Sequence, residues 1–238
     1  MIGIILAAGK GKRLRAVWDL PKVLLPVFGK TLLERHVEGL RKMGAEKIIA
    51  VVQYRKEDII NYAEKKHLDI EFVEGNPEDT KYGRSLKQAL KSIDIHDEIV
   101  YVMGDHFIDY DTVIPELEQI KSTDADFVLI GNSIPQVVDP MSASRVLLNK
   151  DGTIKHTGKD ITSYDVLDTG LFYMRASAIP DVLSIDGQFD TTHIVDTLKS
   201  NDKIAKAVDI PDMVWFGCNT PEEVLMGILG LERRKLGL

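Results

Sequence analysis

Residues 4–30 read IILAAGKGKRLRAVWDLPKVLLPVFGK, and this stretch decides the predicted fold. An apolar run of strand length, residues 2–8, stops at Gly9. Basic side chains then follow at short intervals, at Lys10, Lys12, Arg13, Arg15 and Lys22. Helical periodicity does not resume until Thr31. Because a long irregular segment inside a compact domain is usually functional, we expect residues 7–30 to be a structureless ligand-binding loop.

The composition is that of an ordinary globular protein, with 44% hydrophobic and 28% charged residues among 238. No run of 18 or more apolar residues suggests membrane insertion, and residues 2–8 lack the features of a signal peptide, so we expect a cytoplasmic protein. The single cysteine, Cys218, argues against a disulfide framework or a cysteine-based metal site. The net charge of −7 argues against nucleic-acid binding, and a basic cluster in such a chain suits a small, highly charged anion.

The first part of the chain alternates strand and helix signals. Strands are predicted at residues 2–8, 47–53, 70–74, 98–103 and 127–131. Helices are predicted from about Thr31 to Gly44, at 85–93 and at 112–121. This alternation predicts an α/β, Rossmann-like, mostly parallel sheet with helices on both faces.

After about residue 135 the pattern becomes richer in β-structure. Strands are predicted at 143–149, 153–157 and 166–174, with Asp151-Gly152 as a hairpin turn, and a helix at 191–199. A last helix begins with Thr220 as its cap, Pro221 at its first position and Glu223 three residues after the cap. We therefore predict a single domain, 1–238, with an α/β part at about 1–132 and a β-rich part at about 133–238.

The loop after the first strand has the chemistry of a phosphate site. Gly9 and Gly11 let the backbone approach an anion closely. The dinucleotide motif GxGxxG fails at Leu14, and the GxxxxGK[ST] loop is absent. Arg13 suits bidentate binding of phosphate, and Lys22 suits a point charge on a transferring phosphoryl group. The alternative is a surface loop with solvated lysines.

The segments LAAGKGKRL and DLPKVLLPVFGKTLLE resemble the LAAGxGxR…PK signature of the nucleotidyltransferases that activate sugar phosphates. The resemblance implies their fold and their reaction, in which a nucleoside triphosphate and a phosphate monoester are joined and pyrophosphate is released. It makes residues 1–132, approximately, the nucleotide-binding half and residues 133–238 the acceptor-binding half. It makes Arg13 and Lys22 the catalytic residues. It also implies that the nucleotide is bound by Leu6, Ala7, Ala8, Gly9, Gly11, Lys12, Gly83 and Ser85. Ser85 is explained almost as well as a helix N-cap.

A predicted metal site follows the strand at 98–103. Triphosphate chemistry requires Mg²⁺, which one or two carboxylates usually hold together with substrate phosphates. The resemblance places the metal aspartate at Asp105, whereas the alternative is an aspartate that closes a turn or caps the next helix. His106 either contacts substrate or makes a structural hydrogen bond.

The second metal ligand is predicted late in the chain. Many relatives carry W-x-D-x-D-T-P there, but residues 215–221 read WFGCNTP, which lacks both acidic positions. The segment instead resembles that of the N-acetylglucosamine-1-phosphate uridylyltransferases, whose asparagine helps to hold Mg²⁺. The resemblance therefore implies Asn219 as a ligand, and a simple turn residue is the alternative.

The acceptor-binding residues are predicted from two further segments. Lys159 follows Gly158 at the end of the hairpin region and is the candidate for the acceptor's phosphate. Asp168, in the segment DTGLF, resembles the family's (N/D)-(T/A)-G motif that lines the sugar pocket. The alternatives are a solvated lysine and a buried strand with a glycine bulge.

Taken together, these segments look most like the inositol-1-phosphate cytidylyltransferases of hyperthermophilic archaea and bacteria, over about residues 3–225. The resemblance implies CTP and inositol-1-phosphate as substrates, CDP-inositol and pyrophosphate as products, and Mg²⁺ as cofactor. In some such organisms the domain is fused to a membrane-bound phosphoinositol transferase. This chain contains no such segment, so we expect it to stand alone and to pass its product to a separate enzyme of that kind. No particular oligomeric state is predicted.

Other functions remain open at this stage. Within the same class, the acceptor is alternatively a hexose-1-phosphate or phosphocholine, and the base alternatively that of UTP or dTTP. A non-catalytic nucleotide sensor is the alternative from another class, although mere binding does not need a lysine at the α-phosphate. A dinucleotide-dependent dehydrogenase is disfavoured because the third glycine is missing.

Overall fold

The computed structural model describes residues 1–94 and 96–235. The strands of the main sheet are β1 (Ile2–Ala7), β4 (Lys47–Val52), β5 (Glu71–Glu74), β6 (Ile99–Met103), β8 (Phe127–Asn132), β9 (Arg145–Leu148), β10 (Ile154–Gly158), β11 (Val166–Met174) and β12 (Ala205–Asp209). The helices are α1 (Leu32–Lys42), α2 (Lys56–Lys65), α3 (Tyr82–Leu90), α4 (Tyr110–Val113), α5 (Leu117–Ser122), α6 (Ile179–Ser184), α7 (Thr191–Ser200) and α8 (Pro221–Lys235). Two small two-stranded antiparallel sheets pair β2 (Pro26–Val27) with β3 (Lys30–Thr31) and β7 (His106–Ile108) with β13 (Trp215–Gly217).

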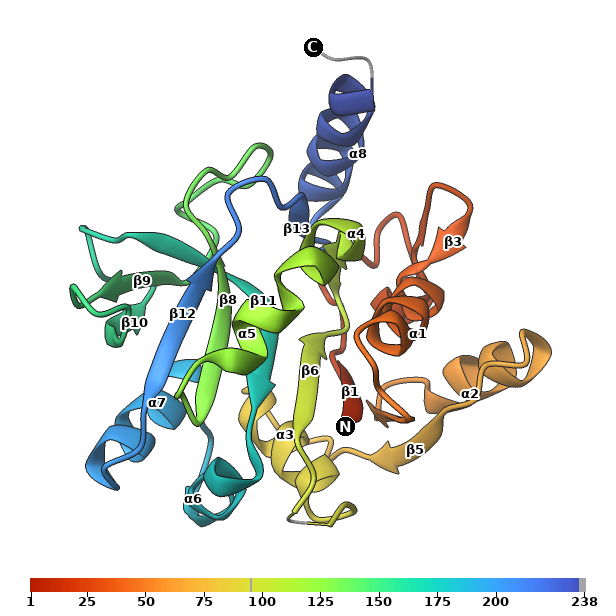
Figure 1. Cartoon of the computed structure of the whole chain (residues 1–238). Helices are drawn as coiled ribbons and strands as arrows, with labels where there is room; N and C mark the ends of the chain where they lie inside the picture. The colour runs from red at the N-terminus through yellow and green to blue at the C-terminus, as the bar shows by residue number, and fades with distance from the viewer. Residues whose placement is uncertain (95, 236–238) are drawn as a thin grey trace.

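The main sheet runs in the order β10-β9-β11-β6-β1-β4-β5, and β8 joins β11 to the edge strand β12. The neighbours β6, β1, β4 and β5 are parallel, whereas β11 runs antiparallel to both β6 and β8. Figure 1 shows the sheet with helices on both faces, so the predicted α/β class and layer order are confirmed. Because β8 pairs with β11 and β12, one sheet runs through both of the predicted halves.

Alternation along the strands explains why both faces are covered. On β1, Ile5 and Ala7 pack with α1, α2 and α4, whereas Ile4 and Leu6 pack with α3, α6 and α7. Successive side chains of a strand point to opposite faces, so a strand that is buried on both sides reads as an uninterrupted apolar run. The segment IGIILA is such a run, and every one of its residues is buried.

The expectation of a structureless loop over residues 7–30 is wrong in its second half. Turns occupy residues 12–17, and a 3₁₀ helix follows at Lys22–Leu24. The hairpin of β2 and β3 completes the segment before α1. Leu14 is buried in a small apolar cluster beneath this loop, together with Leu25 and Phe216. The irregular part therefore ends at Pro21, and it is anchored from below by an apolar side chain.

Two helix boundaries also need correction. The predicted helix at 112–121 is divided into α4, a 3₁₀ turn at Ile114–Glu116 and α5, because Pro115 lacks the N–H that a continuous helix needs. Ser85 is not an N-cap, since α3 begins at Tyr82 after Lys81. By contrast, Gly44 follows α1 with a φ of +95°, as predicted for a glycine just after a helix.

The start of α8 is as predicted, with one shift in detail. The N–H of Glu223 donates to Thr220 Oγ1 at 3.2 Å, which confirms Thr220 as the cap. The Glu223 side chain accepts from the N–H of Asn219 at 2.9 Å, one residue earlier than in a standard capping box. The helix cap therefore also fixes the backbone at Asn219.

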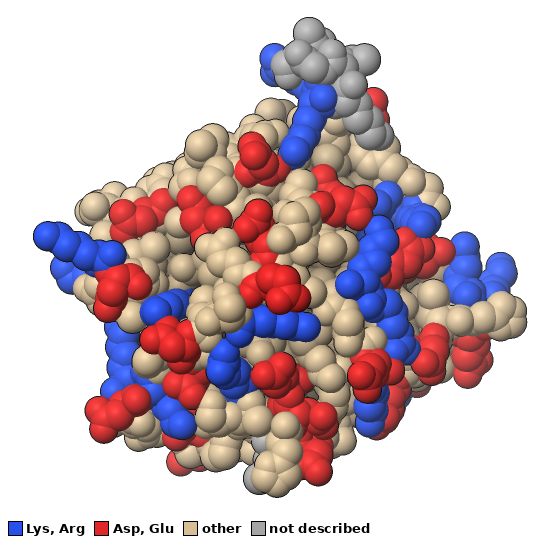
Figure 2. Space-filling view, in the orientation of Figure 1, with Lys and Arg blue, Asp and Glu red and all other residues tan. Residues whose placement is uncertain are grey.

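Charged side chains of both signs are interspersed over the face shown in Figure 2. None of the helices within residues 1–94 and 96–235 combines the length and the apolarity needed to cross a lipid bilayer.

The capping box of α1 makes stability depend on pH. Glu34 accepts from the Thr31 N–H at 2.8 Å and from Tyr62 Oη at 2.9 Å, and it lies 3.1 Å from Lys66 Nζ. Burial alone raises the pKa of Glu34, but these partners outweigh it and lower the pKa to about 2. Since the pKa in the folded state lies below the ordinary value of 4.5, the stabilisation is complete above pH 4.5 and is lost as the pH falls toward 2.

We therefore expect Glu34→Gln to lower the free energy of unfolding at pH 7 by about 1 kcal/mol, the usual worth of a cap. The difference from wild type should shrink steadily between pH 4.5 and pH 3, as measured by urea unfolding at each pH. Glu38→Gln, on the same helix, serves as the control for a lost charge. A pH-independent difference for Glu34→Gln contradicts the assigned role.

Candidate active site

The carboxyl ends of β1 and β6 bring two loops together. The strands are parallel neighbours with Leu6 opposite Met103, so the segments that follow them leave the sheet at the same edge. The N–H of Gly104 donates to the carbonyl of Leu6 at 3.0 Å. A Cβ on Gly104 would lie 2.8 Å from that carbonyl oxygen, so only glycine allows this close crossing. Asp105 therefore emerges directly beside the glycine loop.

A late segment of the chain is held against the same place. Strand β7 begins directly after Asp105 and pairs with β13, in which Gly217 lies opposite His106. The N–H of Cys218 donates to the carbonyl of Asp105 at 2.7 Å. This pairing places Asn219 next to Asp105.

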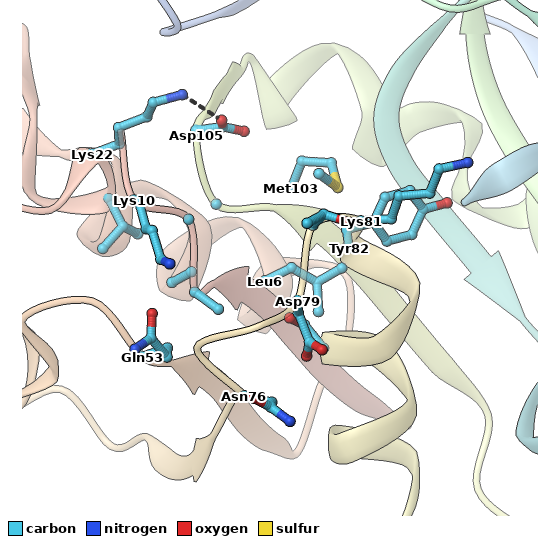
Figure 3. A pocket seen from close by; sticks show the side chains of 17 residues that line it. Leu6, Lys10, Lys22, Gln53, Asn76, Asp79, Lys81, Tyr82, Met103 and Asp105 are labelled. Carbon is cyan, nitrogen blue, oxygen red and sulfur yellow. Dashed lines mark hydrogen bonds and ion pairs between the residues drawn. The ribbon is translucent and has the colours of Figure 1, made fainter. Parts of the chain in front are cut away.

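Lys22 joins these two residues. Its Nζ lies 2.8 Å from Asp105 Oδ2 and 2.7 Å from Asn219 Oδ1, and its side chain is only 12% exposed. Gly11 supports the lysine stem, because its φ is +59° and a Cβ there would lie 3.1 Å from Lys22 Cγ. Figure 3 shows Lys22 reaching over to Asp105 at one end of a pocket. The predicted catalytic lysine and both predicted metal ligands thus meet at one point.

Asp105 is held as an anion at this point. Burial alone raises the pKa of Asp105, but the hydrogen bond with His106 Nδ1 at 3.0 Å and the Lys22 ammonium outweigh it and hold the pKa well below its usual range. The His106 ring stacks on Trp215 with centroids 6.0 Å apart. Of the two roles proposed for His106, the structural hydrogen bond is therefore present.

The first pocket lies between the glycine loop, the end of β6 and the start of α3, and it encloses about 250 Å³. Among the predicted nucleotide-binding residues, Leu6, Ala7, Ala8, Gly9 and Ser85 line this pocket. Lys22 and Asp105 form one end of it (Figure 3). The pocket therefore extends from the Lys22 cluster, which consists of Lys22, Asp105 and Asn219, toward α3.

The other predicted nucleotide-binding residues lie elsewhere. Gly83 packs on Phe189: its N–H donates to the Phe189 carbonyl at 3.0 Å, and a Cβ would lie 2.2 Å from the Phe189 ring. Its observed contacts are those of close packing, and nucleotide binding by Gly83 stays a prediction. Lys12 is exposed and lines neither this pocket nor the next. Arg13 is exposed and lines the second pocket.

The second pocket adjoins the first and is larger, about 580 Å³. Lys81, Tyr82, Met103 and Asp105 line both. The predicted acceptor residues Lys159 and Asp168 and the predicted metal ligand Asn219 all line the second pocket. The Lys22 cluster therefore stands where the two pockets meet.

Both acceptor candidates are oriented by neighbours. Asp168 accepts from the Gly170 N–H at 2.9 Å and from Thr191 Oγ1 at 3.1 Å. Burial raises the pKa of Asp168, and these hydrogen bonds oppose that shift. Lys159 Nζ donates to the Ser142 carbonyl at 3.0 Å. A cation and a carboxylate thus face one cavity, which suits a phosphate that carries hydroxyl groups.

Several residues of the second pocket were missed by sequence reasoning. Asp190 lies 2.6 Å from Lys81 Nζ and 2.7 Å from His193 Nδ1, and Tyr82 Oη lies 2.7 Å from Thr191 Oγ1. The starts of α3 and α7 therefore face each other. The only signal was the polar run Asp190-Thr191-Thr192-His193 at a predicted helix start, which is typical of helix N-termini in general.

The oxygen atoms at the junction, the place where the two pockets meet, fit Mg²⁺. Asp105 Oδ2 and Asn219 Oδ1 both lie within 3 Å of one cation, the Lys22 ammonium, so the two oxygens converge on a position that accepts positive charge. Mg²⁺ is usually held by one or two carboxylates together with substrate phosphates and waters. Within residues 1–94 and 96–235, no group of three or more His, Cys, Asp or Glu side chains is arranged to hold a metal. The binding of Mg²⁺ by Asp105 and Asn219 stays a prediction.

Comparison with known proteins identifies similar chains. The MobA-like NTP transferase domain matches residues 3–155. The bifunctional IPC transferase and DIPP synthase of Rubrobacter xylanophilus is 30% identical over 223 residues, which are 92% of this chain and 49% of that protein. The UTP–glucose-1-phosphate uridylyltransferase AglF of Haloferax volcanii is 33% identical over 109 residues, 44% of each chain. The chain spans about half the length of the first two curated relatives that it matches.

Among solved structures, the inositol-1-phosphate CTP transferase from T. maritima superposes with a TM-score of 0.80, covering 95% of both chains at 23% identity. This likeness confirms the predicted nucleotidyltransferase fold.

Proposed function

The chain belongs to the MobA-like NTP transferase domain family, and on that premise we propose that it is a CTP:inositol-1-phosphate cytidylyltransferase. In the proposed reaction, an oxygen of the inositol-1-phosphate forms a bond to the α-phosphorus of CTP. The bond between the α-phosphorus and the bridging oxygen of the β-phosphate breaks, which gives CDP-inositol and pyrophosphate.

One observation carries the proposal: Lys22 contacts both Asp105 and Asn219 where the two pockets meet. A nucleotide in the first pocket and a phosphate monoester in the second would bring their reacting phosphates to this junction. A non-catalytic sensor does not need such a junction. The choice of CTP and inositol-1-phosphate is supported by the likeness to the Rubrobacter IPC transferase and to the T. maritima inositol-1-phosphate CTP transferase.

The chain's own residues act by positioning and by charge. The acceptor's phosphate oxygen is already an anion at neutral pH, so no general base is required. The backbone of the glycine loop holds the β- and γ-phosphates, together with Arg13, which would reach them at the junction from the wall of the second pocket. The Lys22 ammonium neutralises charge that develops at the α-phosphate. Lys159 holds the incoming phosphate and Asp168 accepts hydrogen bonds from hydroxyls. When bound, Mg²⁺ held by Asp105 and Asn219 supplies further neutralisation of the phosphates.

The proposed product is an activated inositol phosphate, and its use requires a second transfer reaction. A membrane-bound phosphoinositol transferase is the proposed consumer.

A second candidate is uridylyl transfer to a hexose-1-phosphate. It is favoured by the likeness to the Haloferax uridylyltransferase, although that likeness covers under half of the chain. Both candidates place the same groups at the junction, and they differ only in the base and the acceptor.

The test is a grid of CTP, UTP, ATP and GTP against inositol-1-phosphate, glucose-1-phosphate, N-acetylglucosamine-1-phosphate and phosphocholine, scored by pyrophosphate release. We expect the highest kcat/KM for CTP with inositol-1-phosphate. A higher value for UTP with a hexose-1-phosphate favours the second candidate. Nucleotide binding without pyrophosphate release in any combination rejects both.

A further inference from the structure

Asp79 is a buried carboxylate in the wall of the first pocket. It lies between β5 and α3, and its side chain is only 6% exposed. Figure 3 shows it between Leu6 and Asn76, away from the end formed by Lys22 and Asp105. If the phosphates lie at Lys22, as in the proposed function, the base of the nucleotide lies at this end.

The Asp79 carboxylate has no hydrogen-bond donor among residues 1–94 and 96–235. Arg84 Nε forms an ion pair with Oδ1 at 3.0 Å, which balances the charge of the carboxylate but lies outside hydrogen-bond geometry, so both oxygens can still accept hydrogen bonds. Buried polar groups are nearly always hydrogen-bonded, because an unmade bond costs the desolvation of the group. An unsatisfied carboxylate at the wall of a pocket therefore indicates a ligand that donates hydrogen bonds.

The carboxylate is not needed to shape its own loop. Asn76 Oδ1 accepts from the Glu78 N–H at 3.0 Å, and the Asn76 carbonyl accepts from the Asp79 N–H at 3.1 Å. Gln188 Oε1 accepts from the N–H groups of Thr80 and Lys81, both at 3.1 Å. Other groups thus hold the segment, and the Asp79 side chain stays available to a ligand.

We propose that Asp79 reads the base by accepting a hydrogen bond from the exocyclic amino group of cytosine. At the same position uracil presents a carbonyl oxygen, which would meet the carboxylate with like charge and no proton to share. The proposal rests on the proposed function and deepens it, because it names the residue that separates CTP from UTP. Adenine and guanine also carry amino groups, so they are included in the test.

The experiment compares wild type, Asp79→Asn and Glu78→Gln. Glu78→Gln is the matched control, because it makes the same change at an exposed neighbour in the same loop. Isothermal titration calorimetry with Mg²⁺ measures Kd for CTP, for UTP and for the CTP analogue that lacks the 4-amino group. Binding of ATP and GTP is measured in the same way, and a thermal melt checks folding.

We expect wild type to bind CTP at least about tenfold more tightly than UTP or the amino-free analogue, as a single base-reading contact typically provides. Asp79→Asn should reduce the CTP-to-UTP ratio to about threefold or less, because an amide can also donate to the uracil oxygen. The ratio of CTP to the amino-free analogue should fall less, because the neutral amide oxygen still accepts from the 4-amino group. Glu78→Gln should keep the wild-type ratios. If Asp79→Asn does not fold, the ratio of CTP to its amino-free analogue in wild type still decides the matter.

Equal affinity of wild type for CTP and the amino-free analogue overturns the proposal. So does a preference for CTP over UTP that Asp79→Asn retains in full, or a purine nucleotide that binds more tightly than CTP through Asp79. The proposed function is judged separately, by pyrophosphate release. If CTP is selected through Asp79 but inositol-1-phosphate is not a substrate, only the acceptor is wrong. If the substrates react but the affinity ratio of CTP to UTP is the same in wild type and Asp79→Asn, only the base-reading role is wrong.

Discussion

Replacing Lys22 by methionine is expected to lower kcat/KM for pyrophosphate release by roughly 10²–10³-fold, the effect of removing one preorganised donor from a developing charge. Methionine keeps most of the length of the lysine stem, so the packing of Gly11 on Cγ is retained. The variant therefore removes the ammonium with little change in shape. The loss should appear mainly in kcat, because the charge on the transferring phosphoryl group develops during the reaction.

Lys30→Met is the matched control. Lys30 lies in the same part of the chain, but its ammonium is exposed and pairs with Glu38 at 2.7 Å. It should keep near-normal turnover. Circular dichroism melts of both variants separate a catalytic loss from misfolding. Turnover of Lys22→Met within tenfold of wild type, in a folded protein, would show that Lys22 is not catalytic.

The sequence predicted the parts of the fold whose signals are local. The run Ile2–Ala7 is apolar throughout because β1 is buried on both faces, and the strand boundaries agree to within a residue or two. The sequence also predicted the glycine after α1 and the Thr220-Pro221 start of α8, because residues that are neighbours in sequence make helix caps. Helix α2 was missed, because only Ile59 and Ala63 are buried and two positions make no clear periodicity.

The residues at the junction were predicted by the family resemblance. Local sequence patterns alone could not predict that they meet. Lys22 and Asn219 are far apart in the chain, and they meet because β7 pairs with β13. Each of these strands has three residues, too few for a period-two signal. The positions of Asp105 and Lys22 at one edge of the sheet do follow from parallel strand order, since ligands bind at the carboxyl ends of such strands.

The roles of residues whose contacts come from segments distant in sequence could not be predicted. Asp79 and Asp190 each lie in polar segments before a helix, where aspartate is common for local reasons. Gly83 was assigned to the nucleotide by resemblance, whereas its contact with Phe189 shows a packing constraint that no local pattern contains. In each case the role of the side chain is set by a segment distant in sequence.

The charges at the junction predict how nucleotide binding depends on Mg²⁺. Asp105 is ionised and partly buried beside Lys22, so a nucleotide whose α-phosphate lies at the junction, as proposed, would approach both a cation and an anion. Without a divalent ion, the carboxylate repels the phosphates. With Mg²⁺, the same carboxylate is predicted to become a ligand. Asp105 is therefore predicted to make nucleotide binding depend on the metal.

Asp105→Asn is expected to lower kcat/KM by roughly 10²–10⁴-fold, because the charge stabilisation attributed to a catalytic metal is several kcal/mol. A binding measurement tests the cause apart from activity. In EDTA the variant should bind CTP at least as tightly as wild type, since a repelling charge is gone. In Mg²⁺ it should bind CTP more weakly than wild type. Asp111→Asn, which removes an exposed carboxylate paired with Lys42, should leave both affinities unchanged.

Combining the two substitutions tests whether the junction acts as one unit. If Lys22 and Asp105 stabilise the same phosphate, the double variant should lose little more activity than the more damaged single variant, because groups that act together are not additive. Losses that multiply would place the two residues in independent roles. If Asp105→Asn weakened CTP binding equally in Mg²⁺ and in EDTA, the metal role would be contradicted directly. A ligand of Mg²⁺ must affect CTP affinity more when the ion is present.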